Sequence, residues 1–510
     1  MVKAFFASMT FSAALLGCAQ TEAPNPPPAE EESESQASLT TSTKWLVQPG
    51  ARLVLLGVTS DNHALYQEGE LVYATALKPG ATRQRVAQVP FGNTAFVYTV
   101  GKVAFCWTNP DRTLPGFGVS PLVVWSAASG PHEASAASPI GTFATSASAD
   151  GRSVLFPTHG NADGSVGDVE LASIDMSERT TLLGAVPMGF PLGYCRPFAA
   201  FVGRYGRSHP VALHCEGATS SATLSSWERG ERVDLLSGVA TPPFFSADAD
   251  GGSFFTTLAG SGHPVVVSDD GEVSALDEVR SRIGFFTKGS FVVYTAQTEA
   301  GLELRRAKPG DCPSTETIAD EVGGILTVLA GSKVITDAWA SPDGSKVPFF
   351  TQRDPATGLS DVALADARDG TPPLSVDPQA RNVLGGPPFS ADSKHFLFAR
   401  IVDLTAGTAP LFASAEGGVR QFSDDGGWSY LPAVRGLVSF NDNTHFDAED
   451  FARSTADLKV VDLSRKPLKP RVIAPGANLT YFSSHGGRRL AFTTDLPGTT
   501  AGLYSAGVGE

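Results

Sequence analysis

A short pattern, usually Ser-x-Asp followed by a small residue and in two copies Ser-x-Asp-Gly, recurs between apolar segments along the chain from Trp45 onward. The clearest copies are Ala147–Phe156, Phe245–Phe255, Ala340–Phe350, Phe389–Phe398 and Phe482–Phe492. Weaker copies without the Asp are Gly101–Phe105, Gly289–Tyr294 and Gly436–Phe440; Ser60–Asn62 begins a first unit, and Arg196–Phe201 falls where a further one is due. Neighbouring units are about 47 residues apart. One copy would be a common turn, but five in register indicate a repeat architecture.

Each unit predicts a β-hairpin followed by two more strands. The Asp bonds to its own backbone in an Asx turn and the Gly adopts a positive φ, so we expect Asp343 and Gly344 to join the first two strands of one unit. A third strand follows, as at Val265–Val267 or Val362–Leu364, and a turn such as Asp269–Gly271 leads into a fourth. Four short strands, with no convincing helix, make one blade of a β-propeller.

The sequence therefore predicts an all-β chain, with a β-propeller of eight to ten four-stranded blades over residues 44–510. Ten candidate units exceed the usual four to eight blades, so two propellers remain an alternative. We favour one continuous domain because no segment between residues 45 and 510 has a linker-like composition. The last unit supplies three strands up to Glu510, and we expect residues 44–48 to add the outer strand that closes the ring.

The unit Trp339–Phe350 resembles the WD40-like repeat of TolB-type propellers, which also occurs in the propeller domains of prolyl-oligopeptidase relatives. The resemblance covers most of residues 45–510, as a repeat pattern. It implies a propeller fold, and it implies function only broadly. Propellers of this type hold protein complexes together, shield enzyme active sites or bind ligands at the central channel.

Residues 1–18 are typical of a bacterial secretion signal. Lys3 precedes an apolar run, Ala4–Leu16, that is too short to span a bilayer as a helix. The run leads through Leu-Leu-Gly into Cys18, which resembles the lipobox whose Cys is acylated; an ordinary signal peptide with an incidental Cys is the alternative. We expect Cys18 to carry the lipid that anchors an exported lipoprotein, since no other segment approaches 18 apolar residues in a row.

Residues 19–43 are rich in Pro, Glu, Ser and Thr and lack hydrophobic periodicity, which predicts a disordered tether. Ala19, rather than Asp, follows the Cys, and by resemblance to other lipoproteins this favours the outer membrane, on its periplasmic or surface face. The formal net charge of −15 argues against nucleic acid as a partner, because phosphate binding requires clustered Lys and Arg. It also argues against docking on anionic lipid headgroups.

The sequence contains no linear catalytic motif. Gly-x-Ser-x-Gly, His-Glu-x-x-His, a P-loop and a dinucleotide fingerprint in strand–helix context are all absent. We therefore expect a non-enzymatic scaffold that binds an envelope protein or a ligand. The alternatives are a purely structural envelope component and an envelope hydrolase or lyase with its residues on blade loops at the channel mouth, since such a site leaves no linear motif.

Two acidic segments are candidates for a metal site, and no other cofactor is expected. Asn161, Asp163 and Asp168 space oxygen ligands somewhat like a calcium loop, but the bidentate Glu of such a loop is missing. Asp442 and Asp447 lie in a denser acidic segment, residues 442–450, where blades usually present binding loops. A solvated loop is the alternative that we favour in both cases.

Four cysteines besides Cys18 would meet an oxidising compartment: Cys106, Cys195, Cys215 and Cys312. Cys195 and Cys215 are the closest in sequence, and a disulfide between them would stabilise the fold by about 3 kcal/mol. If Cys195 ends the first strand of a blade and Cys215 the third, they lie ~10 Å apart, beyond the ~7 Å limit between Cα atoms. The alternative is therefore buried free thiols.

Overall fold

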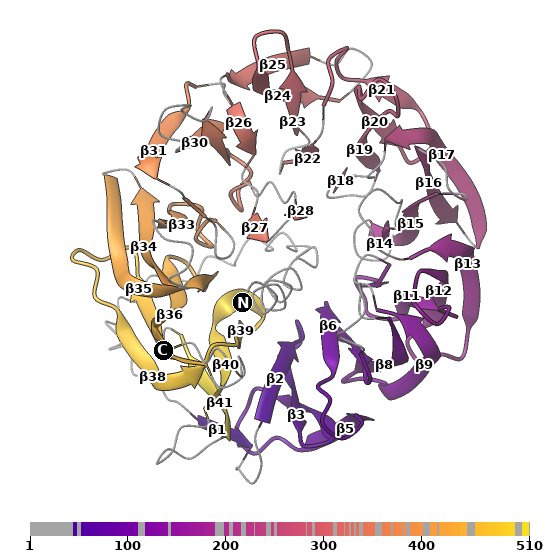
Figure 1. The fold of residues 1–510 in the computed structure, drawn as a ribbon, viewed down its shortest axis with the longest axis vertical. Coiled ribbons are helices and arrows are strands. Elements are labelled where there is room, and N and C mark those ends of the chain that lie inside the picture. The colour runs from indigo at the N-terminus through magenta and orange to yellow at the C-terminus, as the bar shows by residue number, and fades with distance from the viewer. Residues whose placement is uncertain are drawn as a thin grey trace, which may run out of the picture.

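The computed structural model describes residues 44–47, 53–110, 118–140, 144–188, 198–202, 208–215, 221–228, 230–240, 246–248, 252–281, 283–287, 291–309, 314–320, 322–325, 328–330, 333–335, 340–351, 360–368, 371–380, 382–383, 388–400, 408–415, 418–445, 454–494 and 502–508. The strands in these ranges form eight four-stranded antiparallel sheets, one seven-stranded sheet and one isolated hairpin. The sheets follow one another around a ring (Figure 1).

The seven-stranded sheet consists of two blades that share one long strand, β35 (Gly418–Pro432). The first part of β35 pairs with β34 and its last part pairs with β36, with a register shift between Gly426 and Tyr430. Counted this way, the described strands form ten blades, which matches the upper end of the predicted range and lies above the usual four to eight.

We number the blades in chain order. Blades 1 to 3 are β2 Leu53–Val58, β3 His63–Glu68, β4 Leu71–Ala76 and β5 Arg83–Gln88; β6 Phe96–Val100, β7 Val103–Trp107, β8 Val119–Ser126 and β9 Gly130–Pro139; and β10 Ser146–Ala147, β11 Ser153–Thr158, β12 Val166–Ser173 and β13 Arg179–Pro187. Blades 4 to 6 are β14 Phe198–Val202, β15 His209–His214, β16 Ser221–Glu228 and β17 Glu231–Ala240; β18 Ser246–Ala247, β19 Ser253–Thr257, β20 Pro264–Ser268 and β21 Val273–Ala275; and β22 Gly284–Phe286, β23 Val292–Gln297, β24 Leu302–Lys308 and β25 Ser314–Ala319.

Blades 7 to 10 complete the ring. They are β26 Val322–Ile325, β29 Lys346–Thr351, β30 Ser360–Asp366 and β31 Leu374–Ala380; β32 Asn382–Val383, β33 Phe396–Arg400, β34 Thr408–Ala415 and the first part of β35; the last part of β35 with β36 Leu437–His445, β37 Thr455–Asp462 and β38 Arg471–Asn478; and β39 Tyr481–Ser483, β40 Arg489–Thr494, β41 Gly502–Gly507 and β1 Lys44–Val47. The helical content of the described residues is one short 3-10 turn, η4 (His485–Gly487), within blade 10.

The predicted closing strand is confirmed. β1 pairs antiparallel with β41, with Lys44 opposite Ser505, Trp45 opposite Tyr504 and Val47 opposite Leu503. The N-terminal strand thus becomes the outer strand of the last blade, and it covers an edge that would otherwise expose unpaired backbone groups.

The core is divided into ten apolar clusters, each of which joins two neighbouring blades. The cluster between blades 10 and 1 contains Leu53, Leu55, Tyr66, Ala491 and Leu503, so the last blade packs against the first. Burying one large apolar side chain stabilises a fold by about 1.5–3 kcal/mol. The described blades therefore form one closed ring, and the two-propeller alternative is wrong.

The conformation predicted for the turn in blade 7 is confirmed, but this turn does not by itself join the first two strands of the blade. Gly344 has a φ of 74°, and the backbone N–H of Ser341 donates to the carbonyl oxygen of Lys346, so the chain reverses there. The strand that pairs with β29, however, is β26, and twenty residues lie between the end of β26 and the start of β29. The intervening segment includes the hairpin β27 Val328–Ala330 and β28 Lys333–Ile335, which lies on the inner side of the ring (Figure 1).

The predicted position of the turn in blade 4 is wrong. Residues 196–201 were expected to begin that unit with its turn, but the apolar segment Phe198–Val202 is itself the first strand, β14, and the chain reverses between β14 and β15. This blade lacks the Ser-x-Asp-Gly pattern, so only the average spacing located it, and spacing does not distinguish a strand from the turn that follows it.

Candidate ligand pocket on the connection face

The antiparallel order of the strands gives the ring two different faces. The turns between first and second strands and between third and fourth strands lie on one face, which we call the turn face. The loops between second and third strands and the connections from one blade to the next lie on the opposite face, the connection face. In blade 1, for example, Leu71 pairs with Gln88, and the backbone N–H of Val89 donates to the carbonyl oxygen of Glu70.

The turn face is built from polar turns whose Ser and Asp side chains bond mainly to the backbone of their own turn. In blade 3 the Ser148 hydroxyl donates to Asp150 Oδ1 (2.6 Å) and accepts the backbone N–H of Ser153 (3.0 Å), while Asp150 accepts the N–H of Arg152 (3.0 Å). Partial burial acts to raise the pKa of Asp150, but the Ser148 hydroxyl and the Arg152 amide together lower it below its usual range. The Asx turn expected from the sequence is therefore present, and the preceding Ser completes it.

The same arrangement recurs in blade 7. Ser341 Oγ donates to Asp343 Oδ1 (2.5 Å) and accepts the N–H of Lys346 (2.9 Å). Partial burial acts to raise the pKa of Asp343, but hydrogen bonds from Ser341 and Ser345 leave it below its usual range. Because these carboxylates already accept bonds from their own turns, few of their acceptor positions face a ligand.

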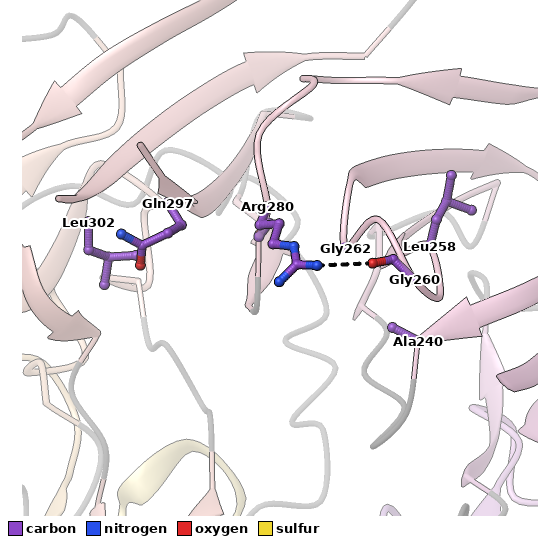
Figure 2. A pocket seen from close by; sticks show the side chains of 8 residues that line it. Ala240, Leu258, Gly260, Gly262, Arg280, Gln297 and Leu302 are labelled. Atoms are coloured by element: carbon purple, nitrogen blue, oxygen red, sulfur yellow. Dashed lines mark hydrogen bonds between the residues drawn. The ribbon is translucent and has the colours of Figure 1, made fainter. Parts of the chain in front are cut away.

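A pocket opens on the connection face between blades 5 and 6, with a volume of about 330 Å³. It is bordered by the end of β17, the β19–β20 loop, the connection from β21 to β22, and the β23–β24 loop. Its lining residues are Ala240, Leu258, Gly260, Gly262, Arg280, Ser281, Gln297 and Leu302 (Figure 2). These residues are small, apolar or polar, with one cation, and none is an Asp, Glu, His or Cys.

Arg280 is the charged group of this pocket and is held in place by backbone carbonyls. Its Nε donates to the carbonyl oxygen of Ser261 at 3.2 Å. Its Nη2 donates to the carbonyl oxygen of Gly260, also at 3.2 Å (Figure 2). The stem of Arg280 lies over Gly262, where a Cβ would meet Arg280 Cγ at 3.3 Å. Gly262 also has a φ of 72°, so both the space and the backbone favour glycine there.

A second feature of the connection face is the loop from β5 to β6, which presents Phe91. This side chain is 90% exposed, although hydrogen bonds to the buried side chain of Gln67 hold the loop around it in place. The buried Gln67 donates to the carbonyl oxygens of Gly69 and Asn93, both at 2.8 Å, and accepts the N–H of Ala95 at 2.9 Å. An ordered loop thus holds a large aromatic group in solvent, which is the arrangement of an aromatic anchor at a binding surface.

The calcium candidates Asn161, Asp163 and Asp168 lie within the described residues, but their side-chain oxygens bond to separate partners instead of facing one common point. Asn161 Oδ1 accepts the N–H of Val166, and Asp163 Oδ1 accepts that of Ser165, both at 2.9 Å. Asp168 instead contacts His159 Nδ1 at 3.0 Å and accepts the N–H of Ala185 at 2.7 Å. Across the described ranges, no group of three or more His, Cys, Asp or Glu side chains is arranged to hold a metal ion.

The second acidic candidate is described only in part. Asp442 lies in β36, accepts the Ser423 hydroxyl at 2.5 Å and forms an ion pair with Lys459 of the neighbouring strand β37. It is 9% exposed, so this pair lies within the blade rather than on a loop. Asp447 lies outside the described residues.

Cys215 is disulfide-bonded and buried, and Cys106 is a buried free thiol whose pKa burial raises to about 12. Cys215 follows β15, the second strand of blade 4, and not the third strand as expected. The adjacent strands β14 and β15 pair Phe198 with Leu213, so the objection based on two strand spacings does not apply. Cys195 and Cys312 lie outside the described residues, and the pairing of Cys195 with Cys215 stays a prediction.

The N-terminal predictions also lie outside the described residues. They include the signal at residues 1–18, the lipid on Cys18 and the tether at residues 19–43. No helix in the described part of the chain is long and apolar enough to cross a membrane.

Sequence reasoning missed both features of the connection face. Arg280 and Phe91 stand in segments with no motif, and the pocket joins residues from four loops between Ala240 and Leu302. The one local signal was compositional: a Phe beside Pro90 and Gly92, in a segment with turn character, is an apolar residue where a loop is expected.

Comparison with known proteins gives similar folds at low identity. No family model and no curated protein matches the sequence. A eukaryotic initiation factor structure is similar over 75% of this chain and 90% of its own, with 11% identity and a TM-score of 0.47. A prolyl endopeptidase is similar over 81% of this chain and 55% of its own, with 11% identity and a TM-score of 0.39. TolB from Acinetobacter baumannii covers 66% of this chain and 80% of its own, with 14% identity and a TM-score of 0.28. The chain is an all-β propeller by its own sheet topology.

Proposed function

We propose that this chain is a cell-envelope lipoprotein whose propeller binds an envelope protein or a ligand through its connection face, without catalysing a reaction there. The contrast between the two faces carries this proposal. The turns of the turn face are polar and their carboxylates accept bonds from their own backbone, and the exposed apolar residues near that face, such as Leu374, lie in outer strands. The connection face instead offers the exposed Phe91 on a loop and a pocket with a fixed Arg280. Exposed aromatic groups and concave sites are the usual features of binding surfaces.

The position of the closing strand β1 also favours binding through the connection face, because the tether would join the ring on the opposite side. β41 runs from the connection face to the turn face, and Lys44 pairs with Ser505 near the turn-face end of β41. A tether attached before Lys44 would therefore join the ring from its turn-face side. A lipid on Cys18 would then attach the chain on the side opposite the connection face, which the tether would leave open to a partner.

The lining of the pocket favours binding over catalysis. Acid–base or nucleophilic catalysis requires a nucleophile beside a base, or paired carboxylates. Among the lining residues Ser281 is the one hydroxyl, and it donates to the carbonyl oxygen of Ile283 rather than to a base. An envelope hydrolase or lyase would need its reactive groups elsewhere on the ring.

Site-specific photo-crosslinking in intact cells tests this proposal. The crosslinking residue p-benzoylphenylalanine would replace Phe91 or Ser261 on the connection face, and Lys102 or Arg152 on the turn face as matched controls; Arg152 is 86% exposed. We expect discrete adducts from the connection-face positions and few from the controls. Equal adducts from both faces, or adducts from the turn face alone, would contradict the proposal.

A further inference from the structure

We propose that the pocket between blades 5 and 6 binds a carboxylate that carries a small apolar group, with Arg280 as its charged contact. This inference rests on the proposed function, since it names the ligand class of one site on the connection face. Three features of the pocket lead to it: an unneutralised cation, a fixed guanidinium and an apolar wall.

Arg280 has no carboxylate partner among the residues that the structure describes. Eight other arginines of the described chain form ion pairs with Asp or Glu, namely Arg83, Arg152, Arg179, Arg232, Arg305, Arg306, Arg368 and Arg465. Arg280, like Arg420, instead donates to two backbone carbonyl oxygens, and no carboxylate of the described residues pairs with it. Arg280 differs from Arg420 in that it lines the pocket. In a protein with a formal net charge of −15, such a cation inside a pocket favours an anionic ligand.

The guanidinium is ordered before any ligand arrives. The Ser261 and Gly260 carbonyls each accept one of its five N–H groups, and the Gly262 backbone supports its stem. The remaining N–H groups can donate to a carboxylate in the paired geometry that guanidinium favours. Because the side chain is already fixed, binding costs less conformational entropy than it would for a free surface arginine.

The rest of the pocket fits a small apolar group. Ala240, Leu258 and Leu302 supply apolar surface, and Figure 2 shows Leu302 and Gln297 on one side of Arg280 and Leu258 and Ala240 on the other. Gln297 Nε2 donates to the carbonyl oxygen of Thr298, so its Oε1 can accept an N–H from a ligand. A volume of about 330 Å³ lies at the small end of ligand sites and suits a group of one amino acid's size.

The carboxylate could belong to a free organic acid or to the C-terminal residue of a protein, and the two share the same chemistry. We would titrate the full-length chain, purified in detergent, with N-acetyl-leucine by isothermal calorimetry. N-acetyl-leucinamide is the uncharged control ligand, inorganic phosphate tests a general anion site, and a pentapeptide ending in leucine, with and without C-terminal amidation, tests the protein source. We expect the acid to bind about 10-fold or more tightly than the amide, since charge-assisted hydrogen bonds are about twice as strong as neutral ones.

Two variants and one control separate binding from folding. Arg280→Gln removes the charge, and Gln297→Glu places a carboxylate on the antiparallel bridge partner of Arg280, where it would compete with a ligand for the guanidinium; each should weaken N-acetyl-leucine about 10-fold. Arg152→Gln, on the turn face, should bind as the parent does. If Arg280→Gln does not fold, Gln297→Glu still decides the question.

Equal binding of the acid and amide forms, no binding of either N-acetyl-leucine or the peptide with a free C-terminus, or phosphate binding as tightly as these carboxylates would overturn the assignment. Tight binding by the free acid but not by the peptide would identify a small molecule as the source, and the reverse would identify a protein C-terminus. Crosslinks from Phe91, which lies in the loop between blades 1 and 2, do not depend on this pocket. If the carboxylate ligands fail to bind while these crosslinks persist, the ligand class is wrong and the connection face still binds.

Discussion

The backbone N–H of Asp343 donates a hydrogen bond to Ser393 Oγ, 3.0 Å away, and so links the turn of blade 7 to the turn of blade 8. Arg368 strengthens the same corner because it donates to the carbonyl oxygen of Asp343. The repeated turns of the ring are therefore not independent loops: the shape of one turn helps to position the next. A change that distorts the blade 7 turn should consequently cost more than the local strain alone.

Replacing Gly344 with Val tests this turn. Gly344 has a φ of 74°, where a β-branched residue is strained by about 1 kcal/mol or more. We expect Gly344→Val to lower the free energy of unfolding by at least that amount, measured by urea titration. Gly252→Val, in the turn of blade 5, is the control, since Gly252 lacks a positive φ and has no atom within 4 Å of its Cβ position. Equal losses in both variants would show that the turn conformation is not responsible.

The Ser341 hydroxyl should stabilise the fold in a pH-dependent way. The folded-state pKa of Asp343 is lowered from 3.8, so its contribution is present above pH 3.8 and is lost as the pH falls through the lower folded value. Ser341→Ala should therefore cost about 1 kcal/mol at neutral pH and distinctly less near pH 3. Urea unfolding at both pH values measures this difference. In an Asp343→Asn background the pH dependence of the Ser341→Ala effect should disappear; if it persists, another group titrates.

Much of the ring could be predicted from the sequence because its turns carry local chemistry. Ser341, Asp343 and Gly344 fix a turn through their own side chains and backbone, so the pattern is visible without any knowledge of the fold. The closing strand was predictable for a different reason: the last unit lacked one strand and residues 44–48 had no blade of their own.

The shared strand β35 could not be predicted, because it depends on contacts between distant residues. A Cβ at Gly426 would meet Leu411 of the neighbouring strand at 2.5 Å, so only glycine lets the two strands approach there. The register then shifts before Tyr430, and the strand continues into the next blade instead of ending in a loop. The candidate pocket was unpredictable for the same reason, since Arg280 becomes significant only beside Gly260 and Ser261 of another loop.

The lipid anchor is tested by replacing one atom. Cys18→Ser removes the thiol that would be acylated, and the apolar run before it remains intact. We expect the variant to move from the membrane fraction to the soluble fraction when cells are fractionated, because the acyl chains would be the anchor. Cys106→Ser is the matched control, since Cys106 is a buried free thiol within blade 2. A Cys18→Ser protein that stays as membrane-bound as the parent would show that something else anchors the chain.

Closure of the ring by β1 should be visible as thermal stability. Deleting residues 1–49 removes β1 and exposes the edge of β41, whereas deleting residues 1–40 leaves the pairs from Lys44 to Val47 intact. Leu46 also packs against the cluster that joins blades 10 and 1. We expect the longer deletion to melt about 2 °C or more below the shorter one, since losing the burial of Leu46 costs about 1.5–3 kcal/mol and each kcal/mol shifts the melting temperature by roughly 1 °C in a domain of this size.

A point variant tests the packing of Leu46 separately from the presence of the β1 backbone. Leu46→Asp in the full chain places a charge against this apolar cluster while the backbone of β1 remains, so it should produce part of the same loss. The same exposed edge should make the longer deletion aggregate sooner at high concentration, which light scattering would detect. Two deletions that melt alike would mean that β1, although paired in the fold, contributes nothing to holding the ends of the ring together.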